Sequence, residues 1–302
     1  MERMNNIGII TFHTPDNYGA VYQAYALQHY IENTFNTNVE IINFCTERHI
    51  RAYSIFRRKS NSSIKNIALQ LITMFKYKEL HDKQKKFQEY RNKFLHLSSK
   101  RYSSEDELLN DIEPYDIYIT GSDQVFNPNN EFIRAYYMDF PKKNSKKIAY
   151  APSFGISNFT EKVSAKILPF LVDFDSLSCR EKDGSEYLSS LINKEVPVVV
   201  DPVFLLDKNN WEKIAKEPKE KERYIFIYDL CGGEKLISLA HKIKEKTGFK
   251  IICATGNIRK RYKYCISKYN VGPTELLGYI NNAEYVVTDS FHGTSLSLIL
   301  NT

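Results

Sequence analysis

The fold is decided near the N-terminus, by the stretch Gly8-Ile9-Ile10-Thr11-Phe12 and by the turn His13-Thr14-Pro15-Asp16-Asn17-Tyr18-Gly19 that follows it. The first stretch is short and apolar, as expected for a strand. The residues after the turn share one face at helical spacing and predict a helix: Ala20, Val21, Ala24, Leu27, Gln28 and Ile31. Val39 to Phe44 predicts a second strand. This β–α–β beginning is typical of a parallel α/β sheet whose first turn meets a ligand.

Strands and helices continue to alternate along the rest of the chain. Further strands are predicted at Tyr115–Ile119, Ile148–Ala151, Leu177–Arg180 and Val196–Val200, and a helix near 158–172. The last of these strands is almost entirely β-branched, as expected for a strand buried on both faces. After Asp201-Pro202 the pattern restarts, with strands at 224–228, 250–253 and 285–288 and helices at 234–246, 274–281 and 293–300.

Alternation on both sides of residue 202 predicts two Rossmann-like domains, 1–202 and 203–302, with a ligand cleft between them. No closing strand is visible before Thr302, so we expect the second domain to be incomplete at its C-terminus.

The formal net charge of +6 is spread unevenly, because residues 48–101 hold 15 Lys/Arg and 3 Asp/Glu. Apolar residues from Ile64 to Phe75 follow helical spacing, which predicts a basic helical insertion in the first domain at about 48–101. Such a surface could meet nucleic acid, anionic lipid or an acidic substrate. A solvated helical face is an equally good interpretation.

Several classes of protein are disfavoured by what the sequence lacks. The five cysteines, at 45, 179, 231, 253 and 265, show no paired or metal-ligand spacing, which favours a reducing compartment and no metal site. No signal peptide or membrane-length apolar run is present, so we expect a cytoplasmic protein. The absence of Gly-x-Gly-x-x-Gly, Walker and Gly-x-Ser-x-Gly motifs argues against nicotinamide, ATP and serine-hydrolase chemistry.

The segment Thr288-Asp-Ser-Phe-His-Gly-Thr294 is the strongest candidate for chemistry. It joins a strand to a helix that Ser290 or Thr294 can cap, and Gly293 opens that helix. A helix N-terminus attracts anions, and a histidine there can donate to phosphate or exchange protons near neutral pH. We therefore favour a catalytic His292 over a purely structural one.

Three other positions are candidates for ligand contacts. Arg180 precedes a helix and could grip a carboxylate or phosphate, although a salt bridge to a neighbouring acid is the simpler interpretation. The turn Asn17-Tyr18-Gly19 suits a polar ligand, or Asn17 simply caps the helix. The loop Ser122-Asp123-Gln124 follows a strand end, where ligands commonly bind, but it can also be an ordinary turn.

These segments, taken in order, resemble the polysaccharide pyruvyl transferase family. The resemblance rests on Gly8–His13, Asn17–Gln28, Tyr115–Asn127, Tyr150–Gly155, Arg180–Gly184, Asp201–Leu206 and Thr288–Thr294, and it spans nearly the whole chain apart from the basic segment. It implies two facing Rossmann-like domains, as in the two-lobed GT-B type glycosyltransferases. It also implies pyruvyl transfer from phosphoenolpyruvate, the donor substrate, to two hydroxyls of a sugar, with no further cofactor.

The resemblance also implies roles for individual residues. In the family, an Arg-x-His-Gly turn and a separate arginine ahead of a helix are thought to hold the donor; His292 and Arg180 match the histidine and the separate arginine, whereas Ser290 replaces the arginine of the turn. The donor is then expected to contact Arg180, Ser290, Gly293 and Thr294, with His292 as general acid. The acceptor is expected to contact Asn17, Tyr18, Gly19, Ser122, Asp123 and Gln124.

The expected partner is a saccharide of polysaccharide biosynthesis, such as capsule or exopolysaccharide, rather than a nucleic acid. Lipid-linked acceptors would suit a peripheral contact of 48–101 with the anionic inner membrane face. Two alternatives remain open: a sugar-nucleotide glycosyltransferase of the same architecture, and a non-catalytic carbohydrate-binding or assembly protein.

Overall fold

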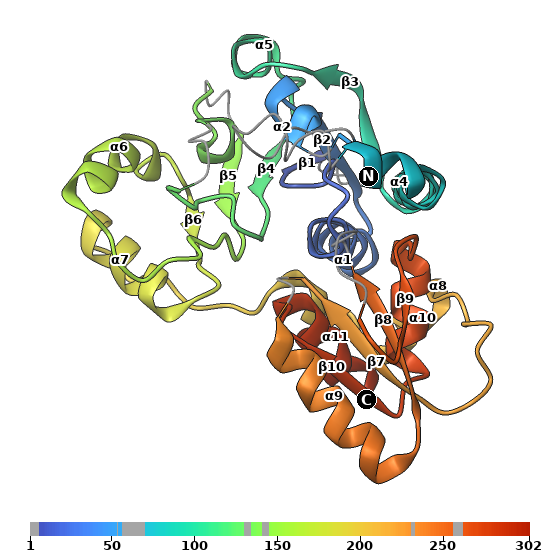
Figure 1. The fold of residues 1–302 in the computed structure, drawn as a ribbon. Helices are drawn as coiled ribbons and strands as arrows, with labels where there is room; N and C mark the ends of the chain where they lie inside the picture. The colour runs from blue at the N-terminus through green and yellow to red at the C-terminus, as the bar shows by residue number, and fades with distance from the viewer. Residues whose placement is uncertain are drawn as a thin grey trace. The chain divides into compact units, whose positions relative to one another are not determined.

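The computed structural model describes residues 6–52, 54–55, 70–129, 134–140, 145–230, 233–255 and 262–302. Its internal contacts divide the chain into two compact units (Figure 1). Unit 1 comprises Met1–Arg51 and Phe94–Leu205, and unit 2 comprises Ala52–Lys93 and Leu206–Thr302. Each unit is built around its own parallel sheet, and each is described by itself.

Unit 1 contains a six-stranded parallel sheet with the order β3-β2-β1-β4-β5-β6. Its strands are β1 (Asn6–Ile10), β2 (Asn38–Phe44), β3 (Leu97–Tyr102), β4 (Ile117–Thr120), β5 (Lys146–Ala149) and β6 (Ser176–Leu177). Its helices are α1 (Tyr18–Phe35), α2 (Glu47–Ala52), α5 (Glu105–Asp111), η1 (Arg134–Tyr137), α6 (Glu161–Leu171), α7 (Lys182–Ile192) and η2 (Pro202–Leu205). The first strand therefore lies in the middle of the sheet, as in doubly wound folds.

Helix α1 fixes the first turn of unit 1. Asn17 begins it as N-cap, and Asn36 ends it in the left-handed conformation. Burial is unbroken from Tyr18 to Gln28, so the predicted apolar face is buried but the helix is also covered on other sides. It packs on β2 and on η2.

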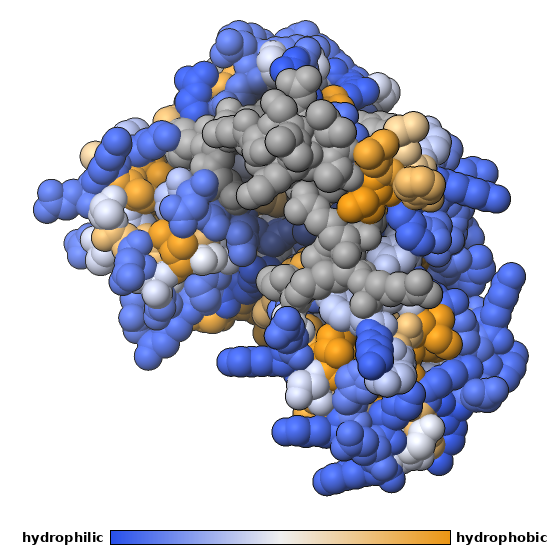
Figure 2. Space-filling view, viewed as in Figure 1, coloured by the Kyte–Doolittle hydropathy of each residue, from blue (hydrophilic) through white to orange (hydrophobic). Residues whose placement is uncertain are grey.

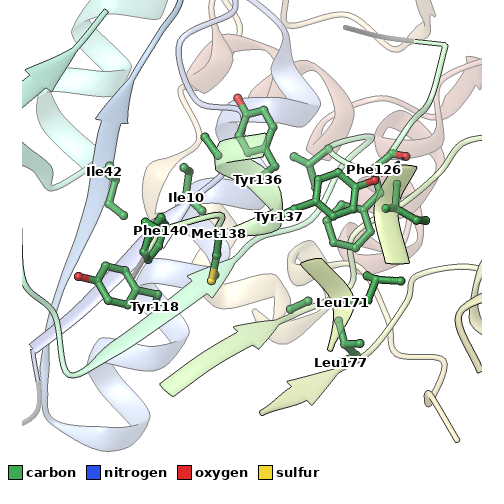
Figure 3. Packing of buried hydrophobic residues seen from close by; sticks show 14 of the residues in the cluster. Ile10, Ile42, Tyr118, Phe126, Tyr136, Tyr137, Met138, Phe140, Leu171 and Leu177 are labelled. Atoms are coloured by element: carbon green, nitrogen blue, oxygen red, sulfur yellow. Dashed lines mark hydrogen bonds between the residues drawn. The ribbon is translucent and has the colours of Figure 1, made fainter. Parts of the chain in front are cut away.

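The core of unit 1 is rich in aromatic rings (Figure 3). Phe126 stacks on Tyr137 with ring centroids 4.3 Å apart, and Tyr136 meets Phe12 edge to face at 5.1 Å. Such pairs contribute about 0.5–1.5 kcal/mol beyond the area that they bury. Helices α6 and α7 lie side by side next to β6 (Figure 1).

Unit 2 contains a four-stranded parallel sheet with the order β10-β7-β8-β9. Its strands are β7 (Tyr224–Asp229), β8 (Lys250–Thr255), β9 (Cys265–Lys268) and β10 (Tyr285–Thr288). Its helices are α8 (Lys208–Ile214), α9 (Glu234–Thr247), α10 (Pro273–Asn281), α11 (Phe291–Leu300) and, up to Lys93, α4 (Tyr77–Phe94). Again the first strand of the unit lies inside the sheet.

Helices cover both faces of the unit 2 sheet, as the fully buried strand β7 shows. Ile225 and Ile227 belong to one apolar cluster with Ala240 of α9. The alternate residue Phe226 instead stacks on Tyr279 of α10, with centroids 5.2 Å apart. Because helices pack on both faces of β7, apolar side chains point to both faces, which agrees with the continuous burial of this strand.

Helix α4 packs against the start of α10 through Lys86. Its Nζ lies 2.9 Å from Glu275 Oε2, 2.9 Å from the Asn270 carbonyl oxygen and 3.0 Å from Asp82 Oδ2. Gly272 permits this approach, because a Cβ there would lie 2.6 Å from the Lys86 Cβ. The contact accounts for the grouping of α4 with unit 2.

The observed boundaries differ from the expected domains 1–202 and 203–302. The sequence predicts the basic insertion, at about 48–101, within the first domain, whereas residues 52–93 group with unit 2. Its end is not helical, since Leu97–Tyr102 forms the edge strand β3. Ile64, Ile67 and Ala68 of the apolar stripe lie outside the described residues.

The predicted strand Val196–Val200 is wrong. The segment makes one isolated bridge, between Val198 and Cys179, and Val198 and Val200 are 52% and 55% exposed. A β-branched run suits any extended backbone, and here no further strand lies beside it in the described residues to complete a ladder. The neighbouring strand is also shorter than predicted, since β6 ends at Leu177.

The visible surface is largely hydrophilic, with apolar side chains in small separate groups (Figure 2). Among the described helices, none is both long and apolar enough to cross a membrane.

Replacing Lys86 with Ala is expected to lower the free energy of unfolding by about 1–3 kcal/mol, because Glu275 and Asp82 lose a partly buried cation. Lys85→Ala is the matched control: its 3.8 Å pair with Glu89 is exposed and should cost below about 0.5 kcal/mol. Urea unfolding measures both. Equal losses in the two variants would contradict the role of Lys86.

The stabilising effect of Lys86 is expected to fade in acid. Burial alone would raise the pKa of Glu275, but the Gly272 N–H and Lys86 outweigh it and hold the pKa below its ordinary value. A carboxylate with a depressed pKa stabilises the fold above its unfolded pKa and loses this effect as pH falls through the folded pKa. The difference between wild type and Lys86→Ala should therefore shrink below about pH 4. A constant difference down to pH 2 would contradict this linkage.

Candidate functional site

Each sheet reverses its strand order at one point, and ligands of open α/β sheets bind beyond the carboxyl ends of the strands there. In unit 1 this switch point lies between β1 and β4, and in unit 2 between β7 and β10. The loops that leave these four strand ends contain most of the candidate residues predicted from the sequence.

At the switch point of unit 1, a buried polar network joins the ends of β1 and β4 to helix α1. Thr11 Oγ1 donates to the Ser122 carbonyl oxygen at 3.1 Å, and Gln23 Nε2 donates to Thr11 Oγ1 at 2.9 Å. The Ser122 N–H in turn donates to Gln23 Oε1 at 3.2 Å. The three side chains are at most 1% exposed. A satisfied network of this kind makes the loop geometry rigid.

Asp201 connects this network to Arg180. Its Oδ2 lies 2.7 Å from Arg180 Nη1 and 3.0 Å from Ser122 Oγ, and its Oδ1 accepts from the Val203 N–H at 3.1 Å. Burial and the nearby Asp201 carboxylate raise the pKa of Tyr150 to about 12, so this phenol stays protonated at neutral pH. The structure thus brings Arg180 and Ser122 together through Asp201, and it shows the salt bridge that was the simpler interpretation of Arg180.

Two residues beside Ser122 adopt the left-handed backbone conformation that non-glycine residues seldom take. Asp123 has φ +68° and Ala151 has φ +52°. They end neighbouring strands, which are joined by a bridge between Asp123 and Pro152 and by the Ser122 Oγ bond to the Ala151 carbonyl oxygen. Strained backbone of this kind is frequent at ligand sites. Gln124 is exposed, and its Oε1 accepts from Asn127 Nδ2 at 2.8 Å.

The first turn of unit 1 is organised by capping. Asn17 Oδ1 accepts from the N–H of Gly19 at 2.9 Å and of Ala20 at 3.5 Å. Tyr18 is 6% exposed and stacks on Tyr22. The structural interpretation of this turn, left open by the sequence, therefore accounts for the Asn17 side chain and for burial of the Tyr18 ring.

At the switch point of unit 2, Ser290 is the N-cap of α11. Its Oγ accepts from the Gly293 N–H at 3.2 Å, and its carbonyl oxygen accepts from the Thr294 N–H at 2.9 Å. His292 lies in the first helical turn and is 8% exposed. Gly293 needs its lack of a side chain, because a Cβ would lie 2.6 Å from Thr288 Oγ1. The turn therefore holds a buried histidine at the positive end of a helix.

A second polar cluster lies at the ends of the neighbouring strands. Asp229, at the end of β7, is 3% exposed and accepts from Tyr262 OH and from Thr255 Oγ1. The next residue, Leu230, donates its N–H to Asp289 Oδ1 at 2.9 Å, which ties the β7 loop to the α11 turn.

Asp201, Gln23 and Asp229 are not among the residues predicted from the sequence to contact a ligand. Asp201 and Asp229 each follow an apolar run, which is a weak signal; no local signal marks Gln23, which is a buried polar residue on an apolar helix. Among the described residues, no group of three or more His, Cys, Asp or Glu side chains could hold a metal ion.

Comparison with solved structures shows the fold. A protein assigned as a UDP-N-acetylglucosamine 2-epimerase from Listeria monocytogenes aligns at 11% identity, over 97% of this chain and 76% of that one, with a TM-score of 0.50. A UDP-GlcNAc 2-epimerase from Methanocaldococcus jannaschii aligns at 14% identity, over 98% of this chain and 81% of that one, with a TM-score of 0.49. An E. coli heptosyltransferase aligns at 11% identity, over 98% of this chain and 86% of that one, with a TM-score of 0.41. The expected α/β fold class, with two Rossmann-like parallel sheets as in GT-B type enzymes, is confirmed.

Comparison with sequences identifies the family. No curated protein matches the chain. The family model for polysaccharide pyruvyl transferase, in contrast, matches residues 17–302. The matched range contains the loop after β4, the Arg180–Asp201 pair, the loop after β7 and the turn that begins α11. The chain therefore belongs to the polysaccharide pyruvyl transferase family, and it is a polysaccharide-modifying transferase.

Proposed function

We propose that the protein transfers pyruvate from phosphoenolpyruvate to a sugar of a polysaccharide or of its lipid-linked precursor, forming a ketal. The observation that carries the proposal is the α11 turn: a capped helix N-terminus with a buried histidine, at the switch point of unit 2, in a member of this family. A helix N-terminus stabilises a phosphate group, and the histidine beside it can supply a proton.

The proposed reaction begins with proton transfer from His292 to C3 of the enol. This forms a methyl group and leaves C2 electrophilic, so that one sugar hydroxyl adds to C2. The bond between C2 and the phosphate oxygen then breaks, and a second hydroxyl completes the ketal. Of the two hydroxyl protons, one replaces that given to C3 and the other leaves with inorganic phosphate. Preorganised charge would supply much of the rate.

The remaining roles extend this proposal to the other candidate residues. Arg180 pairs with the carboxylate or phosphate of the donor, because a guanidinium offers a planar fork that matches either anion. Ser290, Gly293 and Thr294 form the helix start that receives the phosphate. Asn17, Tyr18, Gly19, Ser122, Asp123 and Gln124 are assigned to the acceptor.

The decisive assay is release of inorganic phosphate from phosphoenolpyruvate against a panel of saccharide acceptors. Acceptor-dependent release is expected. Release of nucleotide from a nucleotide sugar, with phosphoenolpyruvate unchanged, would instead support a glycosyltransferase. No turnover together with saccharide binding would favour a carbohydrate-binding protein.

His292→Ala is expected to lower kcat by about 10²–10⁴-fold, because the enol carbon loses its acid. His241→Ala is the matched control, since this histidine lies on α9 with its ring against Tyr264. The control should keep wild-type turnover, and both variants should show wild-type melting curves. Near-normal turnover in His292→Ala would refute the catalytic assignment.

We also propose that the basic segment holds the enzyme at an anionic membrane surface, where a lipid-linked acceptor would lie. Within its described residues, Leu71, Met74 and Phe75 are 53%, 63% and 89% exposed. Lys78 and Lys85 are exposed on the adjoining helix α4. Exposed apolar side chains followed along the chain by exposed cations suit a peripheral contact with acidic lipid.

This contact predicts binding to vesicles that contain phosphatidylserine, and loss of binding in 0.5 M salt, because each Lys near the surface contributes about 1 kcal/mol. The double variant Lys78→Glu with Lys85→Glu should bind more weakly. Lys235→Glu with Lys242→Glu, two exposed positions on α9, makes the same charge change elsewhere and should bind like wild type. Co-sedimentation that ignores salt and acidic lipid would refute the contact.

A further inference from the structure

The carboxylate of Asp201 is the most deeply buried charge of the unit 1 network. Its side chain is 0% exposed, whereas the side chain of its partner Arg180 is 13% exposed. The carboxylate accepts from Arg180 Nη1 and from the Val203 N–H, and Ser122 Oγ lies 3.0 Å from its Oδ2. The ion pair is therefore anchored at its acidic end and reaches the protein surface at its basic end.

Burying a carboxylate costs free energy unless charge and hydrogen bonds compensate it. Here the compensation comes from side chains and backbone that are themselves fixed. Ser122 is held by Gln23 through its N–H, and Arg180 by its own N–H, which donates to the Pro152 carbonyl oxygen at 3.2 Å. The position of the Asp201 carboxylate is therefore fixed, and the carboxylate holds the Arg180 guanidinium in one orientation.

We propose that Asp201 is a positioning residue: it holds Arg180 in the orientation that receives the anionic group of the donor. This inference rests on the proposed function, because it assigns the support of the arginine that is proposed to bind phosphoenolpyruvate. An arginine without this support would sample many rotamers, and the donor would have to order it on binding. Ser122 packs its Oγ against the same Asp201 oxygen, at 3.0 Å.

Asp201→Asn tests the inference with minimal change of shape. The variant keeps an oxygen but loses the charge that holds Arg180, so KM for phosphoenolpyruvate should rise and kcat/KM should fall by about 10²-fold, with kcat and the acceptor KM little changed. A merely structural role would instead lower the melting temperature and the active fraction.

Asp116→Asn is the matched control. Asp116 also accepts a hydrogen bond, from the Asn6 N–H at 2.9 Å, but it lies at the amino ends of β1 and β4, at the opposite edge of the sheet from Ser122. This variant should keep the wild-type KM.

Chemical rescue separates positioning from stability. Arg180→Ala should regain activity when guanidinium is added at millimolar concentration, because Asp201 can hold the free cation in the vacated position. Arg180→Ala combined with Asp201→Asn should not be rescued.

The outcomes distinguish this inference from the function on which it rests. Wild-type protein that releases no phosphate from phosphoenolpyruvate overturns both. If the wild type is active, three results overturn the positioning role alone. They are an unchanged KM in Asp201→Asn, a lower KM in that variant, and guanidinium rescue that persists without Asp201. A raised KM at an unchanged melting temperature, with rescue that requires Asp201, supports it.

Discussion

In both units the chain begins its sheet in the middle, and most of the remaining architecture follows from this constraint. Because the strands of each sheet are parallel, all their carboxyl ends lie at the same edge of that sheet. Because the strand order reverses beside the first strand, the loops that leave the two neighbouring strands diverge at this edge. In unit 1 those loops carry Thr11 and Ser122, and in unit 2 they carry Asp229 and the α11 turn. The placement of polar side chains is thus a consequence of strand order.

Much of the fold was predictable because its signals are local. The β–α–β start, the restart after Pro202 and the strands β7, β8 and β10 of unit 2 follow from apolar runs and helical spacing, whereas β9 was not predicted. The failures are non-local. Strand β3 carries Lys100 and Arg101 and depends on its neighbour β2 for its pairing. The Val196–Val200 run makes one isolated bridge, to Cys179, rather than a ladder within the described residues. The turns of the candidate site were likewise predictable from local sequence. The buried residues that contact Ser122 were not, because Gln23 and Asp201 lie 99 and 79 residues from it in the sequence.

Ser290 illustrates how one position can serve two demands. Where the resemblance leads one to expect an arginine, this chain has the residue that caps α11. A serine satisfies the first-turn N–H of Gly293, which an arginine side chain does not do in this geometry. The turn therefore has a capped helix start, whose backbone dipole supplies positive potential there.

The grouping of residues 52–93 with unit 2 has a consequence for how this protein can be divided. The polypeptide passes between the units three times, near residues 51, 93 and 205. A gene fragment that starts after residue 205 would encode the second sheet without α4, leaving Glu275 without Lys86. Neither unit is therefore one continuous stretch of the chain, so a single cut in the polypeptide cannot separate the two units intact.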